Sequence, residues 1–381
     1  MSKYQLLING EMVDGDLTMD VLNPATEEKV ADCPRASVEQ LNSAVEAAKH
    51  AFPSWSQTSV DERKGIILKI ADVIEANATE LAQLLTEEQG KPLEAATTEV
   101  YGMAAFCRYF TSLDLPVEVI EDSEARKVEI HHKPLGVIGA IVPWNFPLIL
   151  MAFKLPPALI TGNTMVIKPA PTTPLTSLRF AELIKDLLPA GVVNFITDAN
   201  DLGEPLTAHP DVRKISFTGS TATGAKVMAG AAGLLKRITL ELGGNDAGIV
   251  LDDVDPKEAA PKLFESAFQN SGQVCIAMKR LYVHETIYDE MCTELASIAD
   301  ETVIGNGLEQ GTKLGPLNNK MQYDKVKRLI EDARKDGNVI AGGEVPDQPG
   351  YFIRPTIVKD IKEGSRFCLL YTSPSPRDFT E

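Results

Sequence analysis

One cysteine stands in a context that could make it a nucleophile. Cys275 follows a turn that contains Gly272, after an amphipathic run from 256 to 270. A thiol becomes a strong nucleophile when a loop, a nearby cation or a helix N-terminus favours its thiolate. A small, buried and inert cysteine is the common alternative in intracellular proteins. This stretch alone leaves both interpretations of Cys275 open.

Four further groups with chemical potential lie directly after short apolar runs. Asn145 could donate its side-chain amide to a developing oxyanion, although asparagine between two prolines is also common in turns. Lys168 could reach a ribose or a phosphate, or it could be a solvated loop lysine. Gly219 and Ser220 could present backbone N–H groups to a phosphate where a helix begins, or simply cap that helix. Glu241 could be a general base or half of a structural ion pair.

These groups together satisfy the needs of one reaction. Thiol attack on an aldehyde gives a thiohemiacetal, whose oxyanion needs a hydrogen-bond donor. The adduct expels hydride only when an acceptor lies alongside, and the remaining thioester needs a base that activates water. A cysteine, an amide donor, a carboxylate and a glycine-hydroxyl turn match these needs. The set therefore predicts oxidation of an aldehyde to a carboxylate.

The segment that carries these groups alternates between apolar runs and helical patterns. The apolar runs lie at 137–142, 165–167, 192–196, 215–217 and 238–240, and the helical patterns lie at about 148–160, 175–187, 202–208 and 222–235. This alternation predicts an α/β fold with a parallel sheet and right-handed crossovers. Ligands of such sheets bind beyond the carboxyl ends of the strands, which is where the candidate groups lie.

Two regions precede this sheet. Residues 4–35 predict short strands and turns, and capping-box spacings at Ser37 and Ser59 predict the starts of two helices. The Gly-Lys-Pro tripeptide at 90–92 is interpreted as a break between two further helices. Residues 117–135 alternate around an acidic turn, which predicts a β-hairpin that could serve as an arm for packing or oligomer contacts.

Composition narrows the class of protein. A chain of 381 residues favours two domains, or one domain with insertions. The net charge of −17 argues against a nucleic-acid or anionic-membrane partner. Five cysteines without C-x-x-C spacing argue against disulfides and a structural metal site, and favour a reducing compartment. With no visible signal peptide, and no apolar run longer than about eight residues, we predict a cytoplasmic protein.

The chain closely resembles the NAD(P)-dependent aldehyde dehydrogenase superfamily from about residue 4 to residue 366. The motifs are Pro-Trp-Asn-Phe-Pro at 143–147, Lys-Pro at 168–169, Phe-Thr-Gly-Ser at 217–220, Leu-Glu-Leu-Gly-Gly at 240–244 and Gly-Gln-Val-Cys at 272–275. The resemblance implies a Rossmann-like parallel-sheet cofactor domain at 1–116 and 136–245. It also implies a β-hairpin oligomerisation arm at 117–135 and a second α/β catalytic domain at 246–366.

The resemblance also implies catalytic roles for particular residues. Cys275 matches the family nucleophile, and Glu241 matches its general base. Asn145, with the backbone N–H of Cys275, matches the oxyanion hole, and Lys154 matches a lysine associated with proton relay. No metal ion is implied in this mechanism.

NAD or NADP is the implied cofactor. The residues implied to bind it are Trp144, Lys168, Ala170, Pro171, Gly203, Gly219, Ser220 and Leu242. Lys168 matches the adenosine-ribose contact, and Gly219 with Ser220 matches the pyrophosphate site. NAD-preferring members often carry a glutamate three residues after the lysine, where this chain has Pro171. A carboxylate at this position would repel the 2′-phosphate of NADP. Because this chain has none there, NADP stays possible beside NAD.

A small-molecule aldehyde is the implied substrate, and a homodimer or homotetramer is the implied assembly of the full-length parent. Apolar residues match the family's substrate tunnel or flank the nucleophile, namely Phe146, Leu150, Phe153, Val274 and Ile276. These side chains favour an aliphatic or aromatic aldehyde over a charged one.

The end of the chain departs from the family pattern. The family continues into an acidic-Phe-Gly-Pro motif whose glutamate holds the nicotinamide ribose, whereas this chain reads Gly-Ser-Arg at 364–366. The Ser/Pro-rich residues 367–381 are interpreted as a non-native tail on a truncated enzyme with an incomplete catalytic domain. We expect such a chain to be poorly soluble or weakly active, while its full-length parent is active.

Other functions stay open at this point. Cys275, Asn145 and Glu241 could cleave an activated ester without a cofactor, which would make the protein a thiol esterase. A truncated, inactive form of the dehydrogenase is another possibility. A non-catalytic binding protein on the same scaffold is disfavoured, because the cysteine and the glutamate are both present.

Overall fold

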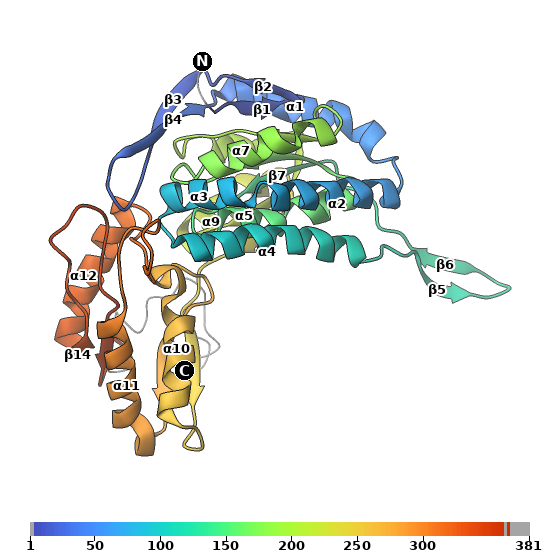
Figure 1. The fold of residues 1–381 in the computed structure, drawn as a ribbon. Helices are drawn as coiled ribbons and strands as arrows, with labels where there is room; N and C mark the ends of the chain where they lie inside the picture. The colour runs from blue at the N-terminus through green and yellow to red at the C-terminus, as the bar shows by residue number, and fades with distance from the viewer. Residues whose placement is uncertain (1–3, 362–363, 366–381) are drawn as a thin grey trace.

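The computed structural model describes residues 4–361, 364 and 365, which form two bodies (Figure 1). A seven-stranded sheet forms the centre of the first body. Its strand order is β11-β10-β7-β8-β9-β1-β2. The strands are β7 (Val137–Ile141), β8 (Thr164–Lys168), β9 (Val193–Phe195), β10 (Val212–Thr218), β11 (Arg237–Glu241), β1 (Leu6–Ile8) and β2 (Glu11–Val13). The strands from β7 to β11 pair in parallel, whereas β1 pairs antiparallel with β9 and β2. The predicted parallel sheet is confirmed.

Helices cover this sheet in the first body, which spans residues 4–241 (Figure 1). They are α1 (Val38–Trp55), α2 (Val60–Ala76), α3 (Ala78–Gln89), α4 (Leu93–Ser112), α5 (Pro147–Ala152), α6 (Leu155–Ile160), α7 (Leu175–Ile184), α8 (Gly203–Ala208) and α9 (Thr221–Ala232). The predicted helix at 148–160 is wrong in one respect, because it is two helices. Pro156 and Pro157 lack the N–H groups that a continuous helix needs, so a new helix begins at Leu155.

Local sequence signals explain where these helices begin and end. The Ser37 hydroxyl accepts the Gln40 N–H at 3.1 Å, and the Gln40 side chain accepts the Ser37 N–H at 3.3 Å, which completes the predicted capping box. Ser59 likewise accepts the N–H of Glu62. Gly90 ends α3 with a φ of 98°, a conformation that glycine adopts without strain.

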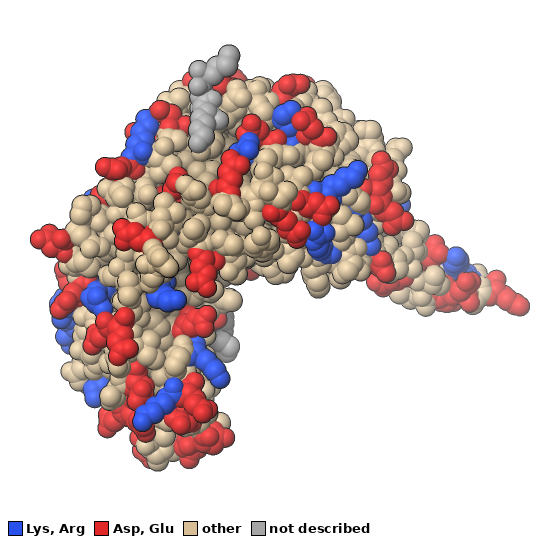
Figure 2. All heavy atoms as spheres, viewed as in Figure 1, with Lys and Arg blue, Asp and Glu red and all other residues tan. Residues whose placement is uncertain are grey.

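The first body also contains two antiparallel strand pairs outside the large sheet. One pair is β3 (Leu17–Leu22) with β4 (Lys29–Arg35), and the other is β5 (Glu118–Asp122) with β6 (Lys127–Ile130). The second pair is the predicted hairpin, and it projects away from both bodies (Figure 1). Figure 2 shows acidic side chains at the tip of this arm and charges of both signs over the viewed face of the bodies.

The second body spans residues 246–361 and lies across the end of the first, so that the two form an L (Figure 1). Its elements are β12 (Asp246–Val250), α10 (Pro256–Phe268), β13 (Met278–Val283), α11 (Tyr288–Glu301), α12 (Lys320–Asp336), β14 (Asn338–Ala341) and β15 (Ile357–Lys359). Strand β12 pairs in parallel with β13, and β14 pairs antiparallel with β15.

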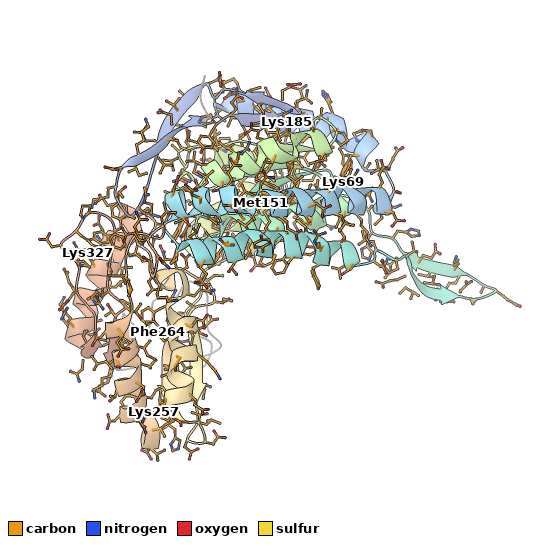
Figure 3. All side chains as sticks on the ribbon, viewed as in Figure 1. Lys69, Met151, Lys185, Lys257, Phe264 and Lys327 are labelled. Carbon is orange, nitrogen blue, oxygen red and sulfur yellow. The ribbon has the colours of Figure 1, made fainter. Side chains whose placement is uncertain are left out.

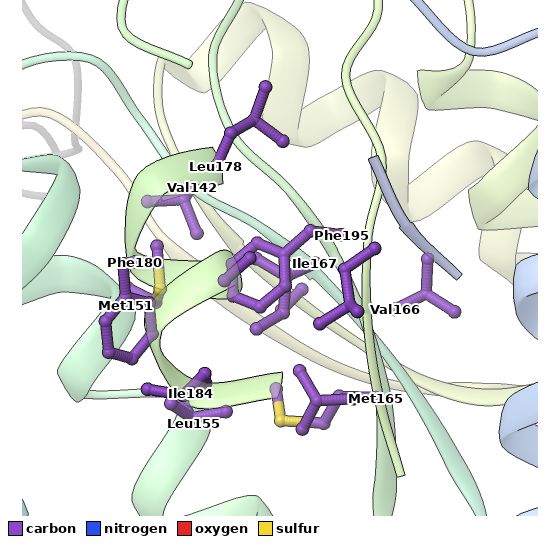
Figure 4. Packing of buried hydrophobic residues seen from close by; sticks show 14 of the residues in the cluster. Val142, Met151, Leu155, Met165, Val166, Ile167, Leu178, Phe180, Ile184 and Phe195 are labelled. Carbon is purple, nitrogen blue, oxygen red and sulfur yellow. The ribbon is translucent and has the colours of Figure 1, made fainter. Parts of the chain in front are cut away.

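Most buried hydrophobic residues in the described part of the chain belong to two separate clusters, one in each body. Figure 4 shows the first cluster, where the rings of Phe180 and Phe195 meet edge to face with centroids 6.1 Å apart. In the second cluster, Phe264 stacks on Phe268 beside Met291. Figure 3 shows Phe264 within the second body and labelled lysines at the outside. Each body therefore has its own source of hydrophobic stability.

Truncation of Phe195 tests the first cluster. The side chain is fully buried, so Phe195→Ala should lower the free energy of unfolding by about 3–5 kcal/mol. Tyr101, an exposed aromatic residue of α4, is the matched control, and Tyr101→Ala should change the value by less than about 0.5 kcal/mol. Urea unfolding followed by circular dichroism measures both. Equal effects of the two substitutions would contradict this assignment of the core.

Candidate active site

A cavity of about 840 Å³ lies where the two bodies meet. Six of the predicted catalytic and cofactor-binding residues lie in its wall: Trp144, Asn145, Gly219, Ser220, Leu242 and Cys275. The first five follow the carboxyl ends of β7, β10 and β11, and the cysteine comes from the second body. The fold therefore brings together residues that are far apart in the sequence. Trp144 and Cys275, for example, are separated by 131 positions.

The turn before Cys275 has an unusual backbone. Asn270, Ser271 and Gly272 have φ values of 51°, 57° and 74°, so three successive residues are left-handed. For the two residues with side chains this conformation costs on the order of 1–3 kcal/mol each. The turn changes the direction of the chain after α10 and brings the half-buried Cys275 to the cavity wall.

Side-chain hydrogen bonds hold this turn from several sides. The Ser271 hydroxyl donates to the Gly315 carbonyl at 2.7 Å. The Gln273 amide donates to the Asn270 carbonyl at 2.9 Å and accepts the Asn318 N–H at 2.9 Å. These bonds compensate for the backbone strain, so the position of the thiol depends on the segment 315–318 as well as on its own loop.

Asn145 is hydrogen-bonded directly to the turn before Cys275. Its side-chain NH₂ donates to the backbone carbonyl of Gln273 at 2.8 Å. Its backbone carbonyl accepts the side-chain NH₂ of Asn270 at 3.0 Å. The same carbonyl accepts a bond from the Lys91 ammonium at 2.8 Å. An amide and a thiol are thereby held at one wall of the cavity, as thiol chemistry with oxyanion stabilisation requires.

Lys154 and Glu241 lie beside the cavity wall. The Lys154 ammonium donates to the Thr218 hydroxyl at 2.7 Å, and Thr218 lines the cavity. Glu241 ends β11 directly opposite Thr218, and its carbonyl accepts the Gly219 N–H at 3.0 Å. Burial lowers the pKa of Lys154 to about 8, against the opposing effect of the Glu241 carboxylate. An amine of this pKa can both take up and release a proton near neutral pH.

Four of the predicted cofactor residues lie at the ends of β8 and β9, away from that wall. The Lys168 ammonium pairs with the Asp198 carboxylate at 2.6 Å, and both side chains are buried. The other Asp198 oxygen accepts the Leu202 N–H at 2.9 Å, just before α8 begins at Gly203. Lys168 and Gly203 are thus joined through an aspartate that sequence reasoning missed. Ala170 accepts a backbone bond in the turn that contains Pro171.

The start of α9 presents backbone N–H donors at the cavity wall, where Gly219 and Ser220 lie. A Cβ added to Gly219 would lie 2.5 Å from the Phe217 ring, and one added to Gly224 would lie 2.6 Å from Leu242. Close packing against Phe217 and Leu242 therefore requires glycine at both positions, while Ser220 caps the helix by accepting the Thr223 N–H. Helix N–H groups and their dipole attract anions, so this end of the sheet fits the pyrophosphate of a dinucleotide.

The predicted substrate-lining residues separate into two groups. Leu150 and Val274 line the cavity. Phe146 instead packs against the Lys91 ammonium, which lies 3.8 Å from its ring centroid, and Ile276 is 73% exposed. Phe153 packs edge to face on Phe106. These last three residues do not line this cavity, so the structure gives no support to a substrate contact for Phe146 or Phe153.

The described residues contain neither a candidate metal site nor a candidate membrane span. Within 4–361, 364 and 365, no group of three or more histidine, cysteine, aspartate or glutamate residues could hold a metal ion. None of the helices in these same residues has the length and apolarity needed to cross a membrane.

A Rossmann-like sheet whose strand ends meet a cysteine-bearing turn is typical of a dinucleotide-dependent oxidoreductase. The sequence model of the aldehyde dehydrogenase family matches residues 12–369. Phenylacetaldehyde dehydrogenase of Pseudomonas fluorescens is 42% identical, with 94% of this chain and 76% of that protein covered. The NADP(+) succinate-semialdehyde dehydrogenase GabD of Escherichia coli K12 is 38% identical, with 96% and 77% covered.

A solved structure gives the same result. The NAD⁺ complex of aldehyde dehydrogenase from Bacillus cereus superposes with a TM-score of 0.93 at 38% identity, covering 96% of this chain and 76% of that one. The chain belongs to the aldehyde dehydrogenase family, and its reaction is the oxidation of an aldehyde with NAD or NADP. It spans about three quarters of the length of these relatives. Residues 367–381, predicted to be a non-native tail, lie outside the described residues.

The pKa of Lys154 makes a prediction about stability. A lysine in the unfolded chain keeps its ordinary pKa of 10.5, whereas the buried amine loses its proton at about 8. Between these values the unfolded state binds more protons, so stability rises with pH in this window. We expect the wild type to gain about 2–3 kcal/mol relative to Lys154→Met between pH 7 and pH 10. Urea unfolding at both pH values measures the difference, and a pH-independent difference would contradict the assignment.

Proposed function

We propose that Cys275 is the nucleophile that attacks the aldehyde carbonyl and that Asn145 stabilises the resulting oxyanion. The observation that carries this proposal is the hydrogen bond between the Asn145 side chain and the Gln273 carbonyl, two residues before the thiol. An amide NH₂ has two N–H donors, and Gln273 takes one of them. The second N–H, together with the backbone N–H of Cys275, is the proposed oxyanion hole of the thiohemiacetal and the thioester intermediates.

Glu241 and Lys154 are the proposed proton-handling groups. Glu241 would activate the water that hydrolyses the thioester, because it ends a strand beside the cavity. Lys154 is hydrogen-bonded to Thr218 and interacts with the Glu241 carboxylate, so it can exchange protons between the cavity and that base. Its pKa of about 8 suits such a relay.

The cofactor would lie along the carboxyl ends of the parallel strands. Gly219 and Ser220 would contact its pyrophosphate. Lys168 would contact the adenosine ribose, because its ammonium has N–H donors in addition to the one that bonds Asp198. The other proposed contacts are Trp144, Ala170, Pro171, Gly203 and Leu242. The bound nicotinamide supplies a hydride acceptor for the thiohemiacetal. Pro171 places no carboxylate near the ribose, so both NAD and NADP fit.

The organisation of the chain supports further proposals. The first body corresponds to the proposed cofactor domain of residues 1–116 and 136–245, and the second to the proposed catalytic domain of 246–366. The arm at 117–135 exposes Val119 and Ile120 by 53% and 60%, which favours contact with a second copy of the chain. A homodimer or homotetramer of the full-length parent is the proposed assembly.

Cys275→Ala tests the nucleophile. In the full-length parent, we expect the aldehyde-dependent rise of NAD(P)H absorbance to fall by more than about a thousand-fold, because Cys275 is the cysteine, among the described residues, that lines the cavity. Cys292 is the matched control, since it is also a partly exposed free cysteine, and Cys292→Ala should retain activity. Full activity of Cys275→Ala would show that the nucleophile is another residue. Turnover of activated esters but of no aldehyde would favour the thiol esterase instead.

Glu241→Gln tests the base. The substitution keeps the shape of the side chain but removes its basicity, so hydrolysis of the thioester should slow by about 10²- to 10⁴-fold while formation of the thioester continues. Mass spectrometry of the peptide that contains Cys275 should then detect the accumulated acyl group after one turnover. An unchanged steady-state rate, with no acyl group on that peptide, would contradict the role of Glu241.

A further inference from the structure

A fully buried lysine lies at the junction between α3 and α4, outside the set of residues discussed for catalysis. The side chain of Lys91 has no exposed surface, and that of its partner Glu99 is 1% exposed, with 2.5 Å between the ammonium and the carboxylate. Burying two charges costs several kcal/mol per ion, and apolar residues of the same size are often no less stable. The ion pair at this position is therefore better explained by the backbone groups to which it is hydrogen-bonded than by a contribution to folding stability.

Lys91 holds the backbone of the oxyanion donor. Its ammonium donates to the Asn145 carbonyl at 2.8 Å and lies over the Phe146 ring. The Asn145 carbonyl accepts a second bond from Asn270 of the nucleophile turn. The peptide group that follows Asn145 is thereby held by two hydrogen bonds to its carbonyl. One of the two donors is the buried Lys91 ammonium, whose charge strengthens its hydrogen bond.

Glu99 holds the other end of the same segment. The oxygen that does not face Lys91 accepts the Leu148 N–H at 2.9 Å and the Ile149 N–H at 3.3 Å. These are N–H groups of the first turn of α5, which have no partner within the helix. The ion pair therefore orients the whole segment from Asn145 to Ile149 as one unit.

The junction of α3 and α4 also contacts the loop that supports the nucleophile. The Asn318 side-chain NH₂ donates to the carbonyls of Glu88 and Gln89, and its backbone N–H donates to the Gln273 side chain. Asn318 is itself buried. One junction in the first body therefore sets the positions of both the amide donor and the turn before the thiol.

We propose that Lys91 is a positioning residue for the oxyanion hole: its bond to the Asn145 carbonyl directs the Asn145 side chain toward the carbonyl group attached to Cys275. This inference rests on the proposed function of Asn145. Charge develops on the oxygen during acyl transfer, so an amide that is displaced or rotated loses its effect on the rate of that step. A reaction of the same thiol that develops no oxyanion does not depend on Lys91.

The test compares two reactions of Cys275 that need no cofactor. Acylation by p-nitrophenyl acetate develops an oxyanion, whereas alkylation by iodoacetamide is a displacement at carbon that develops none. The principal variant is Lys91→Met with Glu99→Gln, in which both charges are removed and the glutamine oxygen can still accept the N–H groups of α5. Lys185→Met, at a partly exposed surface ion pair, is the control.

We expect the double variant to acylate about 10- to 100-fold more slowly, as for a misplaced catalytic group. Alkylation of Cys275, quantified by peptide mass spectrometry, should stay within about two-fold of the wild type because the thiol itself is unchanged. Lys91→Met alone leaves the Glu99 carboxylate unpaired and should have a lower Tm, which the double variant should largely recover. Recovery of Tm without recovery of acylation is the signature of positioning.

Other outcomes would overturn the inference. If acylation recovers together with Tm in the double variant, or if acylation and alkylation fall together, the ion pair has only a structural role. Asn145→Ala separates this inference from the function on which it rests. Wild-type acylation by Asn145→Ala would refute the proposed oxyanion hole itself, whereas slow acylation by Asn145→Ala with fast acylation by the double variant would refute the role of Lys91 alone.

Discussion

The left-handed turn from Asn270 to Gly272 is the constraint on which the site depends. A chain would not adopt three successive positive φ values by itself, because each non-glycine residue there carries strain. Bonds from Asn145, and from the segment 315–318, compensate for that strain. The groups that hold the turn thereby also set the position of the thiol that follows it. The left-handed turn is therefore the source both of the backbone strain and of the position of Cys275.

Three buried lysines of the first body illustrate how surroundings decide the behaviour of the same side chain. Lys91 and Lys168 each have a buried carboxylate within 2.6 Å, whose charge opposes the effect of lost hydration, although burial still lowers the pKa of Lys91. Lys154 has hydroxyl partners instead, so burial lowers its pKa to about 8. The first two suit fixed structural and binding contacts, whereas the third suits proton transfer. In each case the difference comes from the neighbours that the sheet and helices supply.

The parallel sheet explains why distant groups meet. Strands β7, β10 and β11 all run in the same direction, so the residues after each strand arrive at one edge. The second body then contributes its cysteine to the same edge, and the cavity forms between the two. Separate hydrophobic clusters support the two walls, which makes the relative position of the bodies decisive for the distance between Asn145 and Cys275.

The sequence by itself predicted the strands of the parallel sheet, the starts of α1 and α2, and the hairpin, because apolar periodicity, caps and turn residues are local signals. It did not predict strands β12 to β15 or helices α11 and α12 of the second body. It indicated Cys275 and Asn145 by residue type and by place after a turn or a strand. Only the tertiary structure decided what Lys91, Asp198 and Asn318 do. The Gly-Lys-Pro tripeptide indicated a helix break, and nothing local revealed that its lysine reaches a carbonyl 54 positions later. Such contacts depend on how helices and loops pack, which periodicity does not encode.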